Sequence, residues 1–200
     1  VTLPGTQELM KHKYVALILA TGGSDMVRAA HSVGKPAYGV GPGNVPAYVD
    51  RSADVAQAAK YIVASKAFDH SVICATEQAV VADRPIAAQL EEMMKAEGAY
   101  FVDDNIKQIL AKNLFVGHLP NPKGVGKSPQ QLAQQYGFSV PDWARILVVR
   151  LNSVGRDEPL SGEKLTTVLG WYEVDGWEEG CERSLELINY GGRGHSQVIH

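Results

Sequence analysis

The sequence predicts an α/β fold built on a largely parallel sheet. Short apolar runs of strand length alternate along the chain with segments in which apolar residues recur at helical spacing. The runs are nearly continuous in apolar residues, which is typical of strands buried on both faces of a parallel sheet. With 200 residues, 45% of them hydrophobic, the chain is long enough to bury a core as one domain or two small ones.

The N-terminal part has the pattern of a strand–helix–strand unit. Residues 14–20 (YVALILA) form the first apolar run, the turn of Thr21, Gly22 and Gly23 leads into a short helix, and residues 36–40 form the second strand. Glycines after a strand let the backbone approach a pyrophosphate, and a helix N-terminus favours anions. The signal is weak by itself, because no G-x-G-x-x-G is present.

The rest of the chain continues the alternation. Ser52 is the expected N-cap of the next helix, and Asp83 the N-cap of the one after it. Strands are expected at residues 45–50, 78–82, 99–102, 146–149 and 168–174, and helices at residues 53–67, after Asp83, near 106–111 and near 130–136.

The last helix is predicted to start at residues 175–178 (DGWE), which resemble a capping box, and to end at the glycines 191–192. Trp177, Cys181, Leu185 and Ile188 fall on one stripe of this helix. An apolar stripe at helical spacing normally faces the core. We therefore expect Cys181 to be a packing residue.

Charge and hydropathy exclude several classes of function. The net charge of −3, from 19 basic and 22 acidic side chains, leaves no broad basic surface for nucleic acid or an anionic membrane. The longest apolar run is far shorter than the ~20 residues that span a bilayer, and no signal peptide is visible. Two cysteines far apart are not a disulfide framework, so a cytoplasmic location is expected. Both ends look cut, so we expect a fragment.

Cys74 is the most informative residue for chemistry. A lone cysteine is usually a small buried hydrophobe. Cys74, however, lies in a loop between a predicted helix and a predicted strand, where functional groups tend to be displayed. Backbone N–H groups or a nearby positive charge can favour the thiolate at such a place.

Other motifs give weaker or negative signals. Residues 124–128 (GVGKS) suggest a phosphate-binding loop, but the position where that pattern needs its first glycine is Asn121. His70 is close to Cys74 in sequence, and His195 lies between two glycines, which suggests a constrained site. No metal-ligand spacing of His, Cys or Glu is present, so no metal site is expected.

Six stretches taken together resemble the CoA-acylating aldehyde dehydrogenases, which belong to the aldehyde dehydrogenase superfamily and include acetaldehyde dehydrogenases. They occur in the order of that family and cover nearly all of the chain. They are residues 20–50 (ATGGSDMVRAAHSVGKPAYGVGPGNVPAYVD), 65–78 (SKAFDHSVICATEQ), 121–129 (NPKGVGKSP), 137–141 (GFSVP), 157–165 (DEPLSGEKL) and 191–196 (GGRGHS).

The resemblance implies catalytic roles for two residues. Cys74 corresponds to the nucleophile, and His195 matches a histidine near the active site. The stretch 121–129 is typical of the acylating group, with no assigned role beyond shaping the thiol-substrate side. The sequence departs from the family at His70 and Ser71, where Asn-Gly is frequent, and at Arg193, where an apolar residue is frequent.

The resemblance also implies where the cofactor binds. Thr21, Gly22 and Gly23 match the turn near the cofactor phosphates. Glu158 and Leu160 match the loop that holds the nicotinamide ribose and ring. The implied cofactors are NAD and, as co-substrate, coenzyme A; the residues that select NAD over NADP lie outside this sequence.

The resemblance implies a domain organisation as well. Residues 1–38 correspond to the C-terminal part of a Rossmann-like NAD-binding domain and residues 39–190 to the catalytic domain with the nucleophilic cysteine. Residues 191–200 are expected to return toward the cofactor domain. A homo-oligomer, dimer or larger, is implied, and the parent protein could carry an alcohol dehydrogenase domain or be enclosed in a bacterial microcompartment.

The implied reaction converts a short aldehyde, CoA and NAD to acyl-CoA and NADH through a thiohemiacetal and a thioester on Cys74. Hydrolytic aldehyde dehydrogenases carry a glutamate base where this chain has Gly39, and such a base contributes ~10²–10⁴-fold. Two alternatives stay open: a hydrolytic aldehyde dehydrogenase or acyl-phosphate reductase on the same scaffold, and a non-catalytic truncated domain. We expect weak or no turnover from the isolated chain.

Overall fold

The computed structural model describes residues 2–200 and divides into two compact units, the first ending at Pro42 and the second running from Gly43 to His200. The division falls after Pro42 rather than after residue 38. The shift arises because the strand predicted at residues 36–40 pairs within the first unit, so the chain leaves that unit only beyond this strand.

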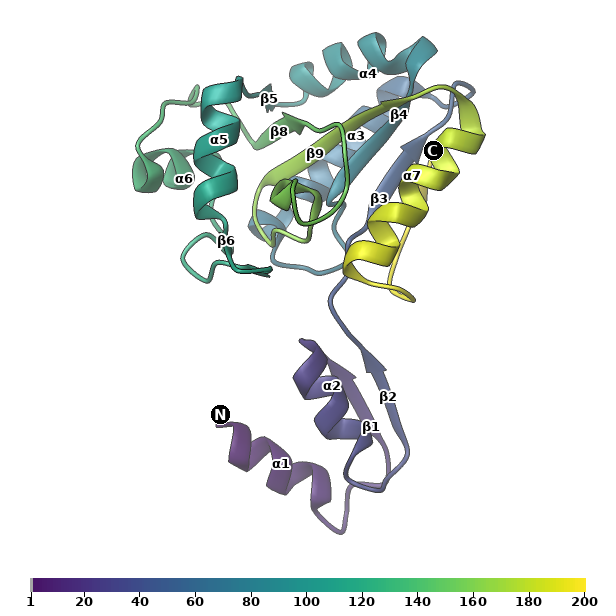
Figure 1. Ribbon diagram of the computed structural model, residues 1–200, viewed down its shortest axis with the longest axis vertical. Coiled ribbons are helices and arrows are strands. Elements are labelled where there is room, and N and C mark those ends of the chain that lie inside the picture. The colour runs from purple at the N-terminus through teal and green to yellow at the C-terminus, as the bar shows by residue number, and fades with distance from the viewer. Residues whose placement is uncertain (1) are drawn as a thin grey trace. The chain divides into compact units, whose positions relative to one another are not determined.

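The first unit is the predicted strand–helix–strand motif preceded by an additional helix. Its elements in chain order are α1 (Leu3–Lys11), β1 (Ile18–Thr21), α2 (Ser24–His31) and β2 (Ala37–Val40), and β1 pairs with β2 in parallel (Figure 1). The first strand begins at Ile18 instead of residue 14, because its partner β2 has only four residues to pair with it. Helix α1 was not expected, although Thr2 as N-cap and a proline in the first turn are its signals.

The second unit holds a six-stranded sheet in which all strand pairs are parallel, in the order β10-β3-β4-β9-β8-β5 (Figure 1). This confirms the α/β class and the parallel-rich sheet. The strands are β3 (Pro46–Val49), β4 (Ala79–Asp83), β5 (Ala99–Phe101), β8 (Ile146–Arg150), β9 (Val168–Val174) and β10 (Val198–Ile199). A separate antiparallel pair joins β6 (Phe115–Val116) to β7 (Leu119–Pro120).

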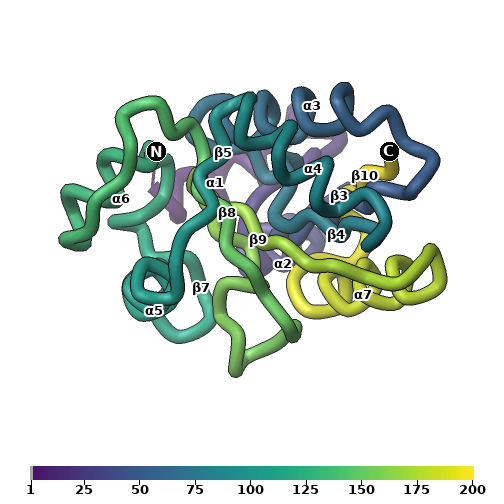
Figure 2. The backbone as a smooth tube through the Cα atoms, turned by 90° about the horizontal axis from the view of Figure 1, so that it is seen from above, coloured from purple at the N-terminus to yellow at the C-terminus, as the bar shows by residue number. Residues whose placement is uncertain are grey.

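Helices cover both faces of this sheet (Figure 2). One core packs α3 (Val55–Ala67) and α4 (Arg84–Ala96) against one face. The other core packs α5 (Asp104–Asn113), α6 (Pro129–Tyr136) and α7 (Gly176–Gly191) against the opposite face. Because both faces are covered, the strands are apolar along their whole length, as their sequences indicate.

Helix α7 buries a different stripe from the one predicted. The residues of α7 that face the core are Gly180, Ser184 and Leu187, whereas Trp177 is 66% exposed, Leu185 is 50% exposed and Cys181 is exposed. The prediction that Cys181 packs in the core was therefore wrong. The reason is close packing: a Cβ atom at Gly180 would lie 2.3 Å from the ring of Tyr48, so the smallest residue faces the sheet.

One of the two predicted helix caps differs and the other is confirmed in position. The N-cap of α3 is Asp54, whose carboxylate accepts from the N–H of Gln57 at 3.0 Å, whereas the predicted cap Ser52 bonds to Asp50. Asp83 is the N-cap of α4, as predicted. Its side chain makes no capping hydrogen bond, because its carboxylate pairs with Arg51 and accepts from Gly176 N–H.

Residues 191–200, expected to return toward the cofactor domain, belong to the second unit, where β10 adds to the edge of the sheet beside β3.

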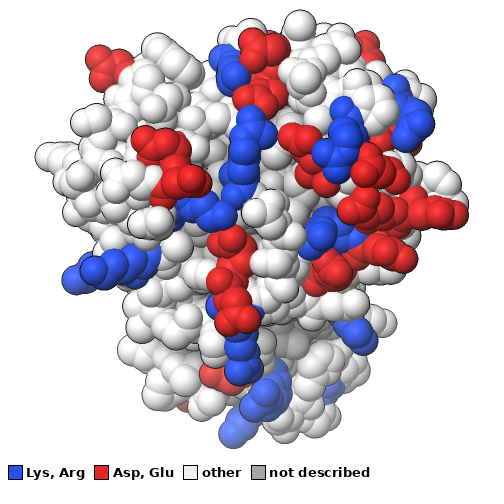
Figure 3. Space-filling model, turned by 45° about the horizontal axis from the view of Figure 1, so that its top comes forward, with Lys and Arg blue, Asp and Glu red and all other residues white. Residues whose placement is uncertain are grey.

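Ion pairs lie at the carboxyl ends of the central strands. They join Arg84 to Asp175 and Arg150 to Glu91. Acidic and basic side chains lie next to one another on the face that Figure 3 shows.

Among the helices of residues 2–200, none has the length and apolar character needed to cross a membrane.

Candidate functional site

The candidate site lies at the amino ends of the parallel strands of the second unit. Three predicted site residues, Cys74, Glu158 and His195, lie on segments that lead into β4, β9 and β10. Parallel strands start at the same edge of a sheet, so these segments converge there. Leu160 lies on the same segment as Glu158. In the first unit, Thr21 is the last residue of β1, and Gly22 and Gly23 follow it.

Cys74 lies in the loop that the sequence predicts, within a hydrogen-bonded turn of that loop. The turn spans Ile73 to Thr76 and is closed by the N–H and the hydroxyl of Thr76, which donate to the Ile73 carbonyl at 3.0 and 2.8 Å. Cys74 is half-buried, between the exposed Ile73 and Ala75. Within residues 2–200, the N–H of Cys74 donates to no protein acceptor, so it is available to a ligand.

The segment before this turn is strained. Asp69, His70 and Ser71 all have φ in the left-handed region, at 47°, 49° and 63°. Non-glycine residues adopt this region rarely, and such outliers gather at functional sites. His70, a site candidate because of its closeness in sequence, is exposed and lines a separate cavity of about 590 Å³ with Trp143 and Gln130.

His195 packs on the glycine loop before β3. A Cβ atom on Gly43 would lie 2.8 Å from Cγ of the His195 ring, and the Nε2 atom of that ring is buried without a partner among the described residues. The N–H of Gly43 donates to the carboxylate of Glu163 at 3.4 Å. Burial raises the pKa of Glu163, opposed by this hydrogen bond and by two nearby lysines.

Asn44 joins three segments of the site and was not singled out from the sequence. It is 2% exposed, and its side-chain NH₂ donates to the carbonyls of Ser161 and Leu187 at 2.9 and 3.0 Å. The glycine loop, the turn after Glu158 and the end of α7 are thereby held together. The fit is tight, because a Cβ atom at Gly191 would lie 2.6 Å from that of Asn44.

The two residues of the predicted ribose and nicotinamide loop are placed differently. The carboxylate of Glu158 pairs with Lys107 Nζ at 3.0 Å and is partly exposed. Leu160 is fully buried in the core, within η2 (Pro159–Ser161). Glu158 is therefore the member of the pair that a ligand can reach directly.

A cluster of buried polar side chains lies beneath the Cys74 turn. Lys66, Gln78 and Lys164 are at most 1% exposed. Burial lowers the pKa of Lys164 to about 7, although Glu163 and Glu158 oppose the shift, and burial lowers the pKa of Lys66 well below its ordinary value. Sequence reasoning missed these residues, because nothing local distinguishes a buried lysine from an exposed one.

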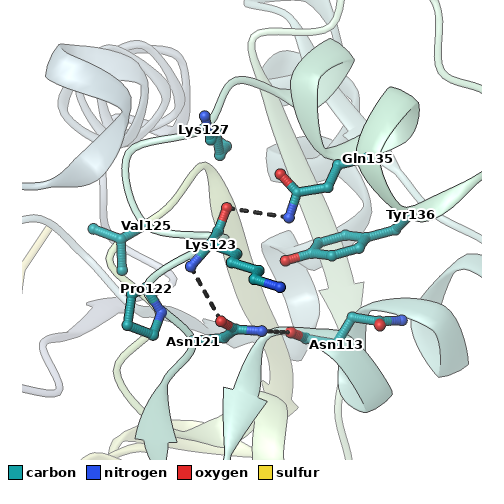
Figure 4. Close-up of a pocket in the computed structure, with 8 residues that line it drawn as sticks. All are labelled: Asn113, Asn121, Pro122, Lys123, Val125, Lys127, Gln135 and Tyr136. Atoms are coloured by element: carbon teal, nitrogen blue, oxygen red, sulfur yellow. Dashed lines mark hydrogen bonds between the residues drawn. The ribbon is translucent and has the colours of Figure 1, made fainter.

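The stretch 121–129 packs beside the nucleophile segment. The N–H of Gly126 donates to the Leu165 carbonyl at 2.9 Å, and a Cβ atom on Gly126 would lie 3.0 Å from the side chain of Val72. The stretch also borders a polar cavity of about 640 Å³, into which Lys123 extends between Tyr136 and Asn113 (Figure 4). The stretch thus lies against Val72, which leads into the Cys74 turn.

In the first unit, the turn of Thr21, Gly22 and Gly23 leads from β1 into α2, as predicted. Gly23 is the N-cap of α2, and its carbonyl accepts from the N–H groups of Met26 and Val27 at 3.0 and 3.2 Å. Within residues 2–200, no group of three or more His, Cys, Asp or Glu side chains has the arrangement of a metal site.

Comparison with known proteins finds relatives that are aldehyde dehydrogenases or aldehyde-alcohol dehydrogenases. No protein-family profile matches the chain. Aldehyde-alcohol dehydrogenase 2 of Entamoeba histolytica is 42% identical over 207 residues, a match that covers 99% of this chain and 24% of that protein. This chain therefore spans about a quarter of the length of that relative.

Solved structures agree in fold as well as in sequence. An acetylating aldehyde dehydrogenase from Geobacillus thermoglucosidasius matches with a TM-score of 0.95 and 46% identity, over 100% of this chain and 44% of that one. The propionaldehyde dehydrogenase of Rhodopseudomonas palustris, solved with CoA and an acylated cysteine, matches with a TM-score of 0.86 and 30% identity, over 100% and 45%. Over its whole length, the chain is thus similar to one part of the acylating aldehyde dehydrogenases.

Proposed function

We propose that this chain carries the nucleophile of a CoA-acylating aldehyde dehydrogenase, which interconverts a short aldehyde, CoA and NAD with acyl-CoA and NADH. One observation carries the proposal. Cys74 is half-buried in a closed turn, with a free backbone N–H, at the edge of the sheet where the segments of Glu158 and His195 converge.

The chemistry follows from this geometry. The Cys74 thiolate adds to the aldehyde carbonyl, a C–S bond forms, and the carbonyl oxygen takes up negative charge that the N–H of Cys74 can stabilise. NAD, when bound, accepts the hydride that leaves the former aldehyde carbon. Cys74 then holds the acyl group as a thioester. The thiol of CoA gives its proton to solvent and bonds to the acyl carbon, and the bond to Cys74 breaks so that Cys74 leaves as a thiolate.

The residues present suit such a cofactor. One carboxylate oxygen of Glu158 pairs with Lys107, which leaves the other as an acceptor for ribose hydroxyls. The unpartnered Nε2 of His195 is a second polar atom that a ligand can satisfy. An engineered glycolyl-CoA reductase, 31% identical to this chain, was solved with NADP⁺ bound. In the second unit, we assign contacts with the cofactor to Glu158 and to the backbone of Leu160. In the first unit, we assign binding of cofactor phosphates to the turn of Thr21, Gly22 and Gly23.

Acyl transfer to CoA is favoured over hydrolysis by the surroundings of Gly39. A Cβ atom at this position would lie 2.4 Å from a methyl group of Val27, so a glutamate base cannot stand there unless the Val27 side chain moves. Without a base, attack by water on the thioester is slow, whereas a thiol needs less help.

Acyl exchange with acetyl-CoA tests the proposal without any redox step. The chain is incubated with acetyl-CoA, and peptide mass spectrometry locates acetyl groups while chromatography measures free CoA. We expect an acetyl thioester on Cys74, released CoA in equal amount, and no such exchange in Cys74→Ala.

The exposed thiol of Cys181 supplies the matched control. Cys181→Ala is expected to exchange as the unaltered chain does. Acetylation of both cysteines at similar rates, or of Cys181 alone, would contradict the proposal, because exposure rather than the site would then govern the reaction. Acetate formed from the Cys74 thioester by addition of water, in excess over the amount of protein, would favour the hydrolytic alternative.

A further inference from the structure

Gln78 is a buried residue that contacts the turn of the nucleophile. It is fully buried and lies directly before β4, four positions after Cys74. Its N–H donates to the Val45 carbonyl at 2.8 Å, and its carbonyl accepts from Gly170 N–H at 2.9 Å. The backbone of Gln78 is therefore fixed by the strands on both sides, which makes it a rigid support for its side chain.

The side chain of Gln78 connects three separate segments. Its oxygen accepts from Lys66 Nζ on α3 at 3.2 Å and from the backbone N–H of Lys164 at 3.1 Å. Its NH₂ group donates to the carbonyl of Thr76 at 3.4 Å, and Thr76 closes the turn around Cys74. An amide is the side chain that can accept twice and donate in this way, since a carboxylate only accepts.

The segment at Lys164 continues this connection toward the predicted cofactor loop. The Lys164 amine donates to the carbonyls of Leu160 and Gly162 at 2.8 and 2.7 Å, which holds the turn after Glu158. The chain from Thr76 through Gln78 to Lys164 and Leu160 is thus continuous. Buried networks of this kind fix one geometry, because each member left unpaired is costly.

We propose that Gln78 is a positioning residue that holds the Cys74 turn in a fixed relation to the loop of Glu158 and Leu160. For its consequence in catalysis the inference rests on the proposed function. Its structural content, that Gln78 controls how Cys74 is presented, can be tested on the thiol itself.

The test compares two thiols of one molecule. The full chain is alkylated with iodoacetamide from pH 6 to pH 10, and peptide mass spectrometry gives the rate at Cys74 relative to that at Cys181. The ratio is read at its plateau, where the rate at each thiol no longer changes with pH, so it reports access rather than ionisation. Gln78→Leu is expected to raise the plateau ratio at least about fivefold, because the half-buried sulfur is released.

Two further variants separate positioning from general stability. Gln78→Glu keeps an oxygen for Lys66 and Lys164 but cannot donate to Thr76, so the ratio is expected to rise while the unfolding temperature changes less than in Gln78→Leu. Gln130→Leu is the matched control: its amide bonds to the carbonyls of Pro141, Asp142 and Ala144, and its loss is expected to lower stability without changing the ratio.

Plateau ratios within twofold of the unaltered chain in both Gln78 variants would overturn the inference, and so would an equal rise in Gln130→Leu. If Gln78→Leu does not fold, Gln78→Glu decides alone. Acetyl exchange measured on the same samples keeps the two proposals apart. An unaltered chain that never exchanges refutes the proposed function, whereas an unaltered chain that exchanges, with unchanged alkylation ratios in the variants, refutes only the role of Gln78.

Discussion

The imidazole of His195 packs so closely on Gly43 that a methyl group there would lie 2.8 Å from Cγ of the ring. Two residues far apart in sequence, one before β3 and one before β10, thereby form a single contact at the edge where Cys74 is presented. Gly43 is not among the glycines with positive φ, so its backbone conformation does not demand glycine. Glycine is needed at this position because the His195 ring leaves no space for a side chain.

Gly43→Ala is expected to destabilise the second unit by about 1–3 kcal/mol, the usual cost of overpacking, because the His195 ring must move. Unfolding in urea followed by tryptophan fluorescence measures this, since Trp143, Trp171 and Trp177 all lie in the second unit. The control is Gly162→Ala, where the nearest atom would be at an ordinary 3.4 Å. Equal midpoints for the two variants would show that the ring adapts freely.

His70→Gly is expected to stabilise the chain by about 1 kcal/mol. Glycine removes the ~1–2 kcal/mol that a left-handed conformation costs an L-residue. Against this, glycine has more conformational freedom in the unfolded chain, which lowers stability by ~0.5–1 kcal/mol. His118, an exposed turn residue without positive φ, provides the comparison, since His118→Gly should destabilise slightly. Thermal unfolding of both variants checks the signs, and a loss of stability in His70→Gly would mean that the strain is not real.

Lys164 should make stability depend on pH. Its pKa in the folded chain is about 7, below the ordinary ~10.4, so between these values the unfolded chain binds more protons and stability rises with pH. The rise is at most about 4–5 kcal/mol, because one pKa unit corresponds to ~1.4 kcal/mol. Lys66 acts in the same direction, and Glu163, whose pKa is raised, acts in the opposite one at lower pH.

Lys164→Met keeps the length of the side chain and removes the titrating amine. Urea midpoints from pH 6.5 to pH 10 are therefore expected to rise less steeply in this variant than in the unaltered chain. The exposed Lys123 serves as control, and Lys123→Met should leave the slope unchanged. Parallel profiles for all three proteins would indicate that the Lys164 amine keeps its charge throughout this range.

Helix α7 allows the same substitution on two faces. Leu187 is fully buried and Leu185 is 50% exposed. Leu187→Ala is expected to cost about 2–5 kcal/mol and Leu185→Ala less than about 0.5 kcal/mol. Free energies of unfolding in urea check this difference. A large loss of stability in Leu185→Ala would mean that the face of α7 predicted from the sequence is the buried one.

Periodicity located most elements because it is a local property. The run predicted at residues 168–174 is β9, and the helix predicted at residues 53–67 is α3 within two residues at its start. It failed on the orientation of α7, because Trp177, Cys181 and Leu185 form an apolar stripe whether or not a sheet lies beneath them. The close approach to Tyr48, which admits only Gly180, is a contact between distant residues and leaves no local signal.

For the site, local sequence patterns were enough to place Cys74 in a loop between helix and strand and His195 between two glycines. The burial of Lys66, Gln78 and Lys164 next to that loop, and of Leu160 in the core, became visible only in the folded chain. The reason is physical. Local pattern sets where a strand or turn begins, whereas the loss of water from a polar group depends on which distant segments close over it.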